Sequence, residues 1–437
     1  MPTEPSPLGR PLPPAWRALV LAVGAYTLAM CTYLPIRAWT GTDFHDFWEN
    51  ARWFLHHGEV RFDLGVHNYL PFFTLFMAPW GVLPLEVALN LFTMLSVGLL
   101  LCTGLMTDVL LRDGELVDRR SGTGTWDRAA RPTITLVLPL LLIAPYAHST
   151  LTLGAVNILL LFLIAAAWLL VRRGRAWIAG VPLGLAVLIK LLPAALLPML
   201  LAARRWRSAV ATGIVMLALG GGFSLLVLGP ERMADAHRQF RESALESHGA
   251  RQTLSVDKPQ KAKYSNISVP IVMRRLLTPV NADPHEQRPG FYVNVVDLSR
   301  ESLWPIYATI MVSLLLTTLA ATWRAGRAET QEPLNATLGA WIALMLLAAP
   351  LVWTHYLVLM HWPLAVAVHR LIETRRRERR VCRPAATAVI AWIIGIAALA
   401  SPHARAVGTA TLAIAVVWGV MITLSLAKPR PARAARE

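Results

Sequence analysis

Residues 17–50 read RALVLAVGAYTLAMCTYLPIRAWTGTDFHDFWEN. The stretch begins with an apolar run and ends in a polar loop that carries acidic, histidine and aromatic side chains. An apolar run of about 20 residues can cross the roughly 30 Å of hydrocarbon in a bilayer. No small-residue cleavage site follows the run, which therefore predicts a permanent membrane anchor rather than a removed signal peptide. The polar loop would then lie at a membrane surface.

The whole chain is rich in apolar residues. Of its 437 residues, 55% are hydrophobic and 16% are charged, and the mean hydropathy is +0.48. A soluble chain of this length would be more polar, so the composition predicts a polytopic membrane protein. The net charge of +16 does not indicate nucleic-acid binding, because the basic residues stand in short runs between apolar segments. Cys31, Cys102 and Cys382 predict neither a disulfide framework nor a zinc site.

Further apolar runs predict an all-α fold with about twelve transmembrane helices. The runs occupy residues 17–35, 86–111, 133–148, 151–171, 177–203, 208–229, 302–323, 334–350, 352–370, 384–400 and 406–427. Basic runs mark cytoplasmic loops. They lie at 112–131, 172–175, 204–207, 324–327 and 375–380, and in the tail from 428. A single helix over 177–203 would put its two flanking basic runs on opposite sides. We therefore divide that run into two arms, 177–189 and 191–203, with Lys190 at the outer turn.

This orientation defines one integral membrane domain, residues 17–427, between cytoplasmic tails at 1–16 and 428–437. The two extracytoplasmic loops with enough polar residues for chemistry are 36–70 and 230–300. In the first loop, Asp43–His57 has the spacing of a helix that lies on the membrane surface.

Asp43 is the candidate catalytic base of the first loop. An ionised carboxylate there could accept a proton from a sugar hydroxyl as it attacks an activated anomeric carbon. The alternative is that Asp43 caps the N-terminus of the helix, a common role for Asp. His45 and Asp46 could form a metal site with Asp43, or be solvated surface residues.

Several polar residues elsewhere are candidates for binding an anionic substrate. Lys190 is flanked by apolar residues, so it should face a cavity or a lipid phosphate, or extend to the headgroups. Arg274 and Arg275 could donate charge-assisted hydrogen bonds to a phosphate, or be ordinary solvated charges. His355, at the outer end of a span, could bind phosphate or sugar, or have a structural role.

A series of motifs extends these observations over most of the chain. In order, the motifs are Asp43-Phe44 with Phe47-Trp48, Tyr69-Leu70-Pro71, Pro79 to Pro84, Gly154-Ala155-Val156-Asn157, Ala179-Gly180 with Gly184, Lys190 and Pro193, the Arg-Arg-Trp-Arg turn at 204–207, Asn266 and Ser268 with Arg274 or Arg275, and Trp353 with His355. In order and spacing, this series resembles the polyprenyl-phosphate-dependent mannosyltransferases of glycosyltransferase family 87, which have the GT-C membrane fold.

The resemblance implies a GT-C fold and sugar transfer, with mannose expected, from a polyprenyl-phosphate donor to an extracytoplasmic glycolipid or glycan, with inversion. Asp43 would be the general base, and Lys190 and His355 would contact the donor phosphate. The other implied substrate-binding residues are Asn266, Arg274, Arg275, Asn157 and Tyr69. No cofactor is implied, since the donor is a lipid-linked sugar, and a divalent metal stays open. The implied location is the plasma membrane, with the site facing outward.

Three positions depart from the family pattern. Ala155 replaces a Gln, Leu70 replaces a Pro, and Tyr356 stands where a second His often occurs. The first departure bears on donor identity. Two other classes of function also fit the residues: a transporter or flippase for a lipid-linked substrate, and a structural membrane subunit that docks partners through the 230–300 loop. A transporter should place its ionisable residues near the midplane and show repeat symmetry.

Overall fold

The structure, a computed structural model, describes residues 14–37, 42–62, 69–116, 134–246, 249–255, 263–283, 290–328 and 331–427. Within these ranges the chain is helical, and the only strand-like pairing is an isolated bridge between Asn266 and Trp353. The prediction of an all-α protein is confirmed. The predicted tail at 428–437 and most of the predicted N-terminal tail lie outside the described residues.

Six helical segments of the described chain are long and apolar enough to cross a membrane. They are α4 (Leu85–Leu116), α6 (Ile134–Leu153), the continuous segment of α10 (Trp206–Val215), η3 (Met216–Phe223) and α11 (Ser224–Leu228), α15 (Arg300–Ala325), α18 (Arg383–Ala397) with η7 (Ala398–Ala400), and α20 (Thr409–Leu426). The chain is therefore a multi-pass membrane protein. Other helices occupy the remaining predicted runs: α1 (Pro14–Arg37), α7 (Asn157–Arg172), α8 (Ala176–Ile189), α9 (Leu196–Ala202), α16 (Glu332–Ala348) and α17 (His361–Glu378). The count of twelve crossings stays a prediction.

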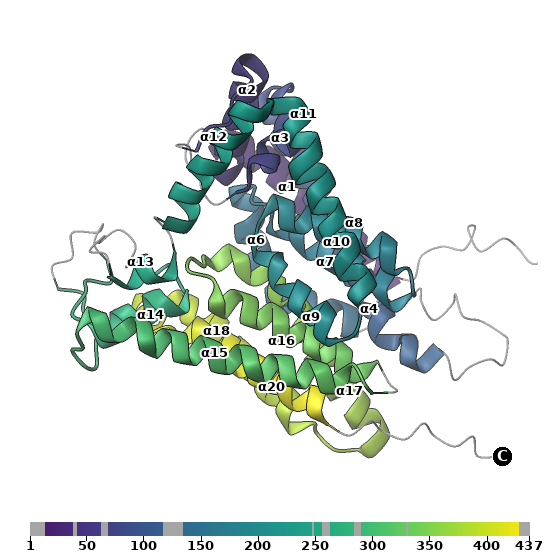
Figure 1. The fold of residues 1–437 in the computed structure, drawn as a ribbon. Coiled ribbons are helices and arrows are strands. Elements are labelled where there is room, and N and C mark those ends of the chain that lie inside the picture. The colour runs from purple at the N-terminus through teal and green to yellow at the C-terminus, as the bar shows by residue number, and fades with distance from the viewer. Residues whose placement is uncertain are drawn as a thin grey trace, which may run out of the picture.

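Four further α-helices lie in the two predicted extracytoplasmic loops: α2 (Asp43–His57), α12 (Pro230–Phe240), α13 (Ala250–Ser255) and α14 (Val269–Leu277). Helix α3 (Pro71–Gly81) follows the first of these loops. In Figure 1, α2 and α12 are labelled near the top and α13 and α14 on the left, whereas α4 and α17 are labelled on the right. The amphipathic loop helices are thus gathered on one flank.

Helix α16 is the centre of the bundle. Every residue from Pro333 to Leu347 is buried, and the helix packs against α15, α17 and α20. Buried indoles tie its neighbours to it. The side-chain oxygen of Asn335 accepts hydrogen bonds from Trp168 Nε1 at 3.0 Å and Arg172 Nη1 at 2.8 Å, and its backbone oxygen accepts one from Trp362 Nε1 at 3.0 Å. These bonds satisfy polar groups that lipid could not satisfy.

The predicted break at Lys190 is confirmed. Helix α8 ends at Ile189, Lys190 is extended, and the chain continues through η2 (Leu192–Ala195) into α9. Close contacts show that α8 and α10 run parallel, because a side chain on Gly180 would overlap Ala211 and one on Gly184 would overlap Val215. Two parallel helices need a connection that returns to their common end. Segment 190–203 makes that return, so the basic runs 172–175 and 204–207 lie at the same end.

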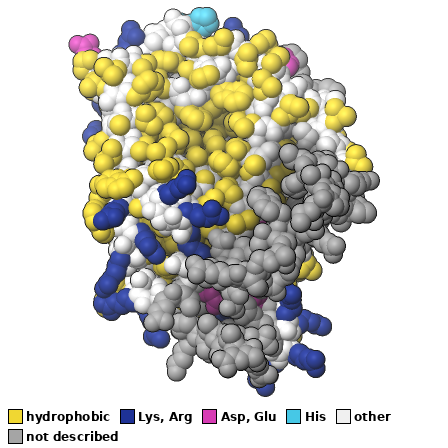
Figure 2. All heavy atoms as spheres, turned by 90° about the vertical axis from the view of Figure 1, so that its right-hand side faces the viewer, with side chains coloured by type: hydrophobic (Ala, Val, Ile, Leu, Met, Phe, Trp, Pro, Cys, Tyr) yellow, Lys and Arg dark blue, Asp and Glu magenta, His cyan; other side chains and the backbone are white. Residues whose placement is uncertain are grey.

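The surface agrees with this arrangement. Figure 2 shows a broad hydrophobic face on the side of the molecule where α4, α8 and α10 lie, with Lys and Arg side chains along its lower edge. Such a face, with its positive charges at one edge, is typical of helices in contact with lipid.

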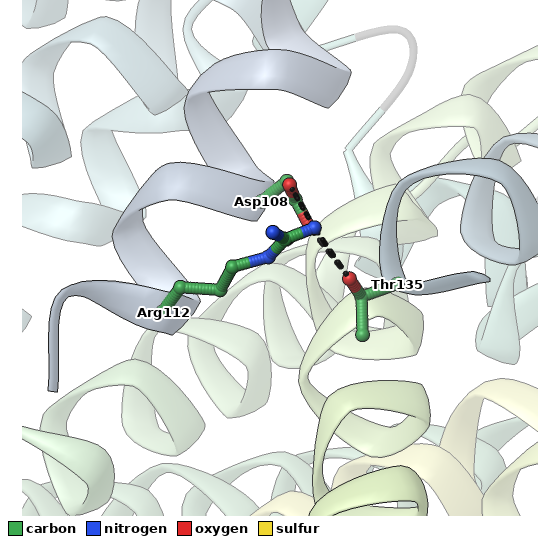
Figure 3. Close-up of polar contacts among 3 residues, drawn as sticks. All are labelled: Asp108, Arg112 and Thr135. Carbon is green, nitrogen blue, oxygen red and sulfur yellow. Dashed lines mark hydrogen bonds and ion pairs between the residues drawn. The ribbon is translucent and has the colours of Figure 1, made fainter. Parts of the chain in front are cut away.

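A cluster of three polar side chains joins α4 to α6 far from α2. In α4, Asp108 Oδ1 accepts hydrogen bonds from Arg112 Nε at 3.0 Å and from Thr135 Oγ1, at the start of α6, at 2.5 Å (Figure 3). Asp108 is 23 residues along α4 from its first residue, Leu85. At 1.5 Å per residue that is about 35 Å, so this cluster joins α6 to the end of α4 that is remote from α2.

Candidate active site

Helix α2 begins as the sequence predicts, but a different residue caps it. Thr42 is the N-cap, and its Oγ1 accepts a hydrogen bond from the backbone N of His45 at 3.3 Å. Asp43 is the first helical residue, so the alternative that Asp43 caps the helix is wrong. At the other end, Gly58 adopts a left-handed conformation (φ 68°), which suits glycine and stops the helix after His57.

The buried face of α2 holds Asp43 in place. Phe44, Phe47 and Ala51 of its apolar face are buried, whereas Leu55 at the end of the same face is 44% exposed. The ring of Phe47 packs edge-on against Tyr69 at 4.9 Å and Phe73 at 4.8 Å between centroids. Aromatic pairs in this geometry stabilise their contact beyond simple burial. The helix therefore cannot rotate without breaking this cluster.

The turn between α6 and α7 packs against the first residues of α2. Gly154 has φ +63°, and a side chain there would overlap Phe44 Cβ. Two residues of the motif at 154–157 therefore have structural roles. The glycine gives room for α2, and Asn157, the first residue of α7, reaches the segment of His355.

His355 faces Asp43. It lies in η6 (Thr354–Met360), and its Nε2 is 3.8 Å from Asp43 Oδ2. The backbone oxygen of His355 accepts hydrogen bonds from Thr150 Oγ1 at 2.9 Å and from Asn157 Nδ2 at 3.4 Å. Asn157 therefore positions His355 through its backbone. Thr150 also positions His355, and no motif in the sequence predicts this contact.

Lys190 lies between two tyrosines beside this pair. Its Nζ is 3.7 Å from the ring centroid of Tyr356 and 5.1 Å from that of Tyr69. The side chain is 5% exposed, and its ammonium has neither a hydrogen bond nor an ion pair with any residue that the structure describes. Cation–π contacts stabilise a cation but do not neutralise its charge. A buried ammonium in this state is suited to an anionic ligand.

The electrostatic environment of Asp43 is set by three effects. Its side chain is 34% exposed, and desolvation by burial raises its pKa from 3.8 to about 6. The charge of Lys190 lowers the pKa, and the charge of Asp46 raises it. These interactions place Lys190 within electrostatic range of Asp43. At neutral pH the carboxyl is mostly ionised and can accept a proton.

The structure does not bring Asn266, Arg274 and Arg275 into this cluster. Asn266 Oδ1 accepts hydrogen bonds from the backbone N of Ser268 at 3.1 Å and of Val352 at 3.4 Å, so it joins the second loop to the segment before His355. Arg274 and Arg275 are buried in α14 and donate to the backbone oxygens of Thr253 and Lys263. The contacts described for these three residues are with the chain itself, and their predicted role in substrate binding stays a prediction.

The possible metal site of Asp43, His45 and Asp46 lies at the start of α2. His45 Nδ1 is 3.9 Å from Asp46 Oδ1 and 4.0 Å from Glu49 Oε2. In the part of the chain that the structure describes, no three His, Cys, Asp or Glu side chains are placed to hold a metal ion.

Comparison with known proteins gives one match. The family model of glycosyltransferase family 87 matches residues 67–350, more than half of the chain. No curated protein and no solved structure shows a significant match. The chain therefore belongs to glycosyltransferase family 87 and is a membrane glycosyltransferase, which selects this function over the transporter and structural-subunit alternatives. The matched range lies between Asp43 and His355, so the roles of these two residues are argued from geometry.

Proposed function

We propose that this glycosyltransferase moves mannose from a polyprenyl-phosphate donor to a hydroxyl of an extracytoplasmic glycolipid or glycan, with inversion and with Asp43 as the general base. The observation that carries this proposal is the meeting of three segments far apart in the sequence. Asp43, Lys190 and His355 come from α2, the break after α8 and η6, and they combine a carboxylate, a buried ammonium and an imidazole.

Each part of this cluster has a role in a single displacement. The acceptor hydroxyl oxygen attacks C1 of the mannosyl phosphate, and its proton passes to the Asp43 carboxylate. The bond from C1 to the phosphate oxygen breaks, and polyprenyl phosphate leaves with the bonding electrons. The Lys190 ammonium, which has no hydrogen bond or ion pair with a described residue, would stabilise the negative charge that develops on the phosphate. His355 would contact the same phosphate.

The membrane setting supports a lipid-linked donor. The α2 helix and the other loop helices lie on one flank. The basic runs that mark cytoplasmic loops lie together at the first turns of α8 and α10, at the end away from Lys190. The site would thus face outward from the plasma membrane. Lys190 sits at the turn of a hairpin between apolar arms, within reach of a lipid phosphate at that surface.

The test distinguishes the loss of a catalytic base from the loss of any negative charge on α2. In purified protein, Asp43→Asn should reduce mannose transfer from polyprenyl-phosphate mannose by about 100-fold or more, because a general base contributes about 10²–10⁴ in rate. Asp46→Asn makes the same change one turn along α2 and should keep most of the activity. Equal activity of Asp43→Asn and wild type would reject Asp43 as the base.

A second variant in the same assay tests the donor contact. Lys190→Met keeps much of the side-chain length and removes the charge, and a lost hydrogen bond to a charged group costs about 1.5–3 kcal/mol. The apparent KM for the donor should therefore rise about tenfold or more, while the KM for the acceptor should not change. A donor titration identical to that of the wild type would refute this role.

A further inference from the structure

Three exposed tryptophans mark one end of the membrane-spanning helices. Trp177 lies in the first turn of α8, Trp206 begins α10, and Trp323 lies in the last turn of α15. Their exposed fractions are 53%, 53% and 49%. A large indole exposed on an apolar helix end is typical of the membrane–water interface, where its ring meets the headgroups.

The three helix ends that carry these indoles are neighbours. Helices α8 and α10 run parallel and in contact from Gly180 and Ala211 onward, so their first residues lie at the same end. Gly326, just after α15, lies so close to Ala203 that a Cβ on this glycine would be 2.9 Å from Ala203 Cα. The end of α15 therefore packs against the turn that leads into α10.

Exposed arginines surround the indoles. We define the basic rim as the six exposed arginines of these three helix ends: Arg173, Arg175, Arg204, Arg207, Arg324 and Arg327. Among the described residues, none of their side chains has an ion pair or a hydrogen bond. Two of them lie over tryptophan rings, with Arg327 Cζ 3.4 Å from the Trp323 centroid and Arg207 Cζ 5.5 Å from that of Trp206. The indoles thus pre-orient guanidinium groups whose positive charge is not neutralised.

We propose that the basic rim binds the phosphate groups of anionic phospholipids. A guanidinium donates paired hydrogen bonds to phosphate oxygens. The rim also combines this chemistry with exposed apolar helix surface for acyl chains: Leu217 in η3 is 75% exposed and Ile178 in α8 is 54% exposed. Figure 2 shows the same combination, an apolar face with Lys and Arg along one edge. A bound headgroup would link the ends of α8, α10 and α15. This site is separate from the Asp43 cluster, because Lys190 lies at the opposite end of α8.

Lipid retention by the purified full-length protein tests the proposal without measuring sugar transfer. Native mass spectrometry would compare phosphatidylglycerol with phosphatidylcholine of the same acyl chains. The rim variant carries Arg175→Gln, Arg207→Gln and Arg327→Gln. The control carries Arg375→Gln, Arg376→Gln and Arg380→Gln, which removes the same charge from the exposed basic run at the end of α17.

The wild type should retain phosphatidylglycerol in preference to phosphatidylcholine. The rim variant should lose affinity for phosphatidylglycerol by about fivefold per arginine, and the control should lose much less. Equal losses in the two variants, or no loss in the rim variant, would overturn the proposal. Displacement of the lipid by millimolar glycerol phosphate would point to a soluble phosphate ligand and would also overturn it. Gel filtration and circular dichroism of both variants would verify that they fold.

Discussion

At the scale of single residues, Asp43 shows two opposing influences on a carboxyl group. As the first residue of α2 it lies at a helix N-terminus, where the dipole favours the ionised form. Burial favours the neutral form and raises the pKa to about 6, so its effect exceeds that of the Lys190 charge, which lowers the pKa. A base with a pKa just below neutral combines ionisation with useful basicity, which is what general-base catalysis needs.

The pKa of Asp43 predicts the pH dependence of sugar transfer. A raised pKa means that the carboxyl takes up its proton at higher pH than an ordinary Asp, so kcat/KM should fall as the pH drops through about 6. Because the charge of Asp46 raises this pKa, Asp46→Asn should move the acid limb to lower pH. Initial rates between pH 4 and 9 would measure both. An acid limb near pH 4 in the wild type would contradict the assignment.

The residues of the site differ in how far the sequence could predict them. Local context makes Asp43 and Lys190 candidates, because a carboxylate in a membrane-surface loop and a cation in an apolar segment are both unusual, and the resemblance to the family implies their roles. Arg274 and Arg275 looked equally suitable, but the fold directs them to backbone carbonyls. Local sequence does not distinguish a cationic side chain that is available to bind a ligand from one that donates hydrogen bonds to the protein's own backbone.

At the scale of elements, the start of α2 depends on the turn between α6 and α7. The bounds of α2 were predicted correctly, because its apolar spacing ends at a glycine and its polar start is plain in the sequence. The contact of Phe44 with Gly154 was not predicted. It joins residues 110 positions apart, and helix patterns carry no information on which turn lies beneath which helix.

This contact predicts that Gly154→Ala impairs activity. The alanine would meet Phe44 and also has to adopt φ +63°, which costs about 1–2 kcal/mol for a residue other than glycine. Displacement of Phe44 would shift Asp43, so kcat/KM should fall by about tenfold or more, since small misplacements of a catalytic group are costly. Enzyme assays and thermal unfolding in detergent would give the two measurements.

Gly174→Ala is the matched control for this variant. Gly174 has φ +73° in the turn between α7 and α8, but nothing lies within 4 Å of the position of its Cβ. The control should therefore lose stability through the same backbone cost and keep its kcat/KM. Equal activities of the two variants would mean that the contact with Phe44 does not position Asp43.

At the scale of the whole molecule, the arrangement depends on the hairpin formed by α8 and segment 190–203. If 177–203 crossed the membrane once, the basic runs at its two ends would face opposite compartments, against the charge rule. The parallel contact of α8 with α10 instead puts both runs at one end and Lys190 at the other. The same hairpin thus sets the orientation of the chain and brings Lys190 to the flank of α2.

Labelling of single cysteines tests this topology. In a background with Cys31, Cys102 and Cys382 replaced by serine, Arg175→Cys and Arg207→Cys should react with a membrane-impermeant maleimide only from the cytoplasmic side. His56→Cys, on the exposed side of α2, should react only from outside. Labelling of the two arginine positions from opposite sides would show that 177–203 is one crossing. Labelling of position 56 from the cytoplasm would place the Asp43 cluster on the wrong side of the membrane for an extracytoplasmic acceptor.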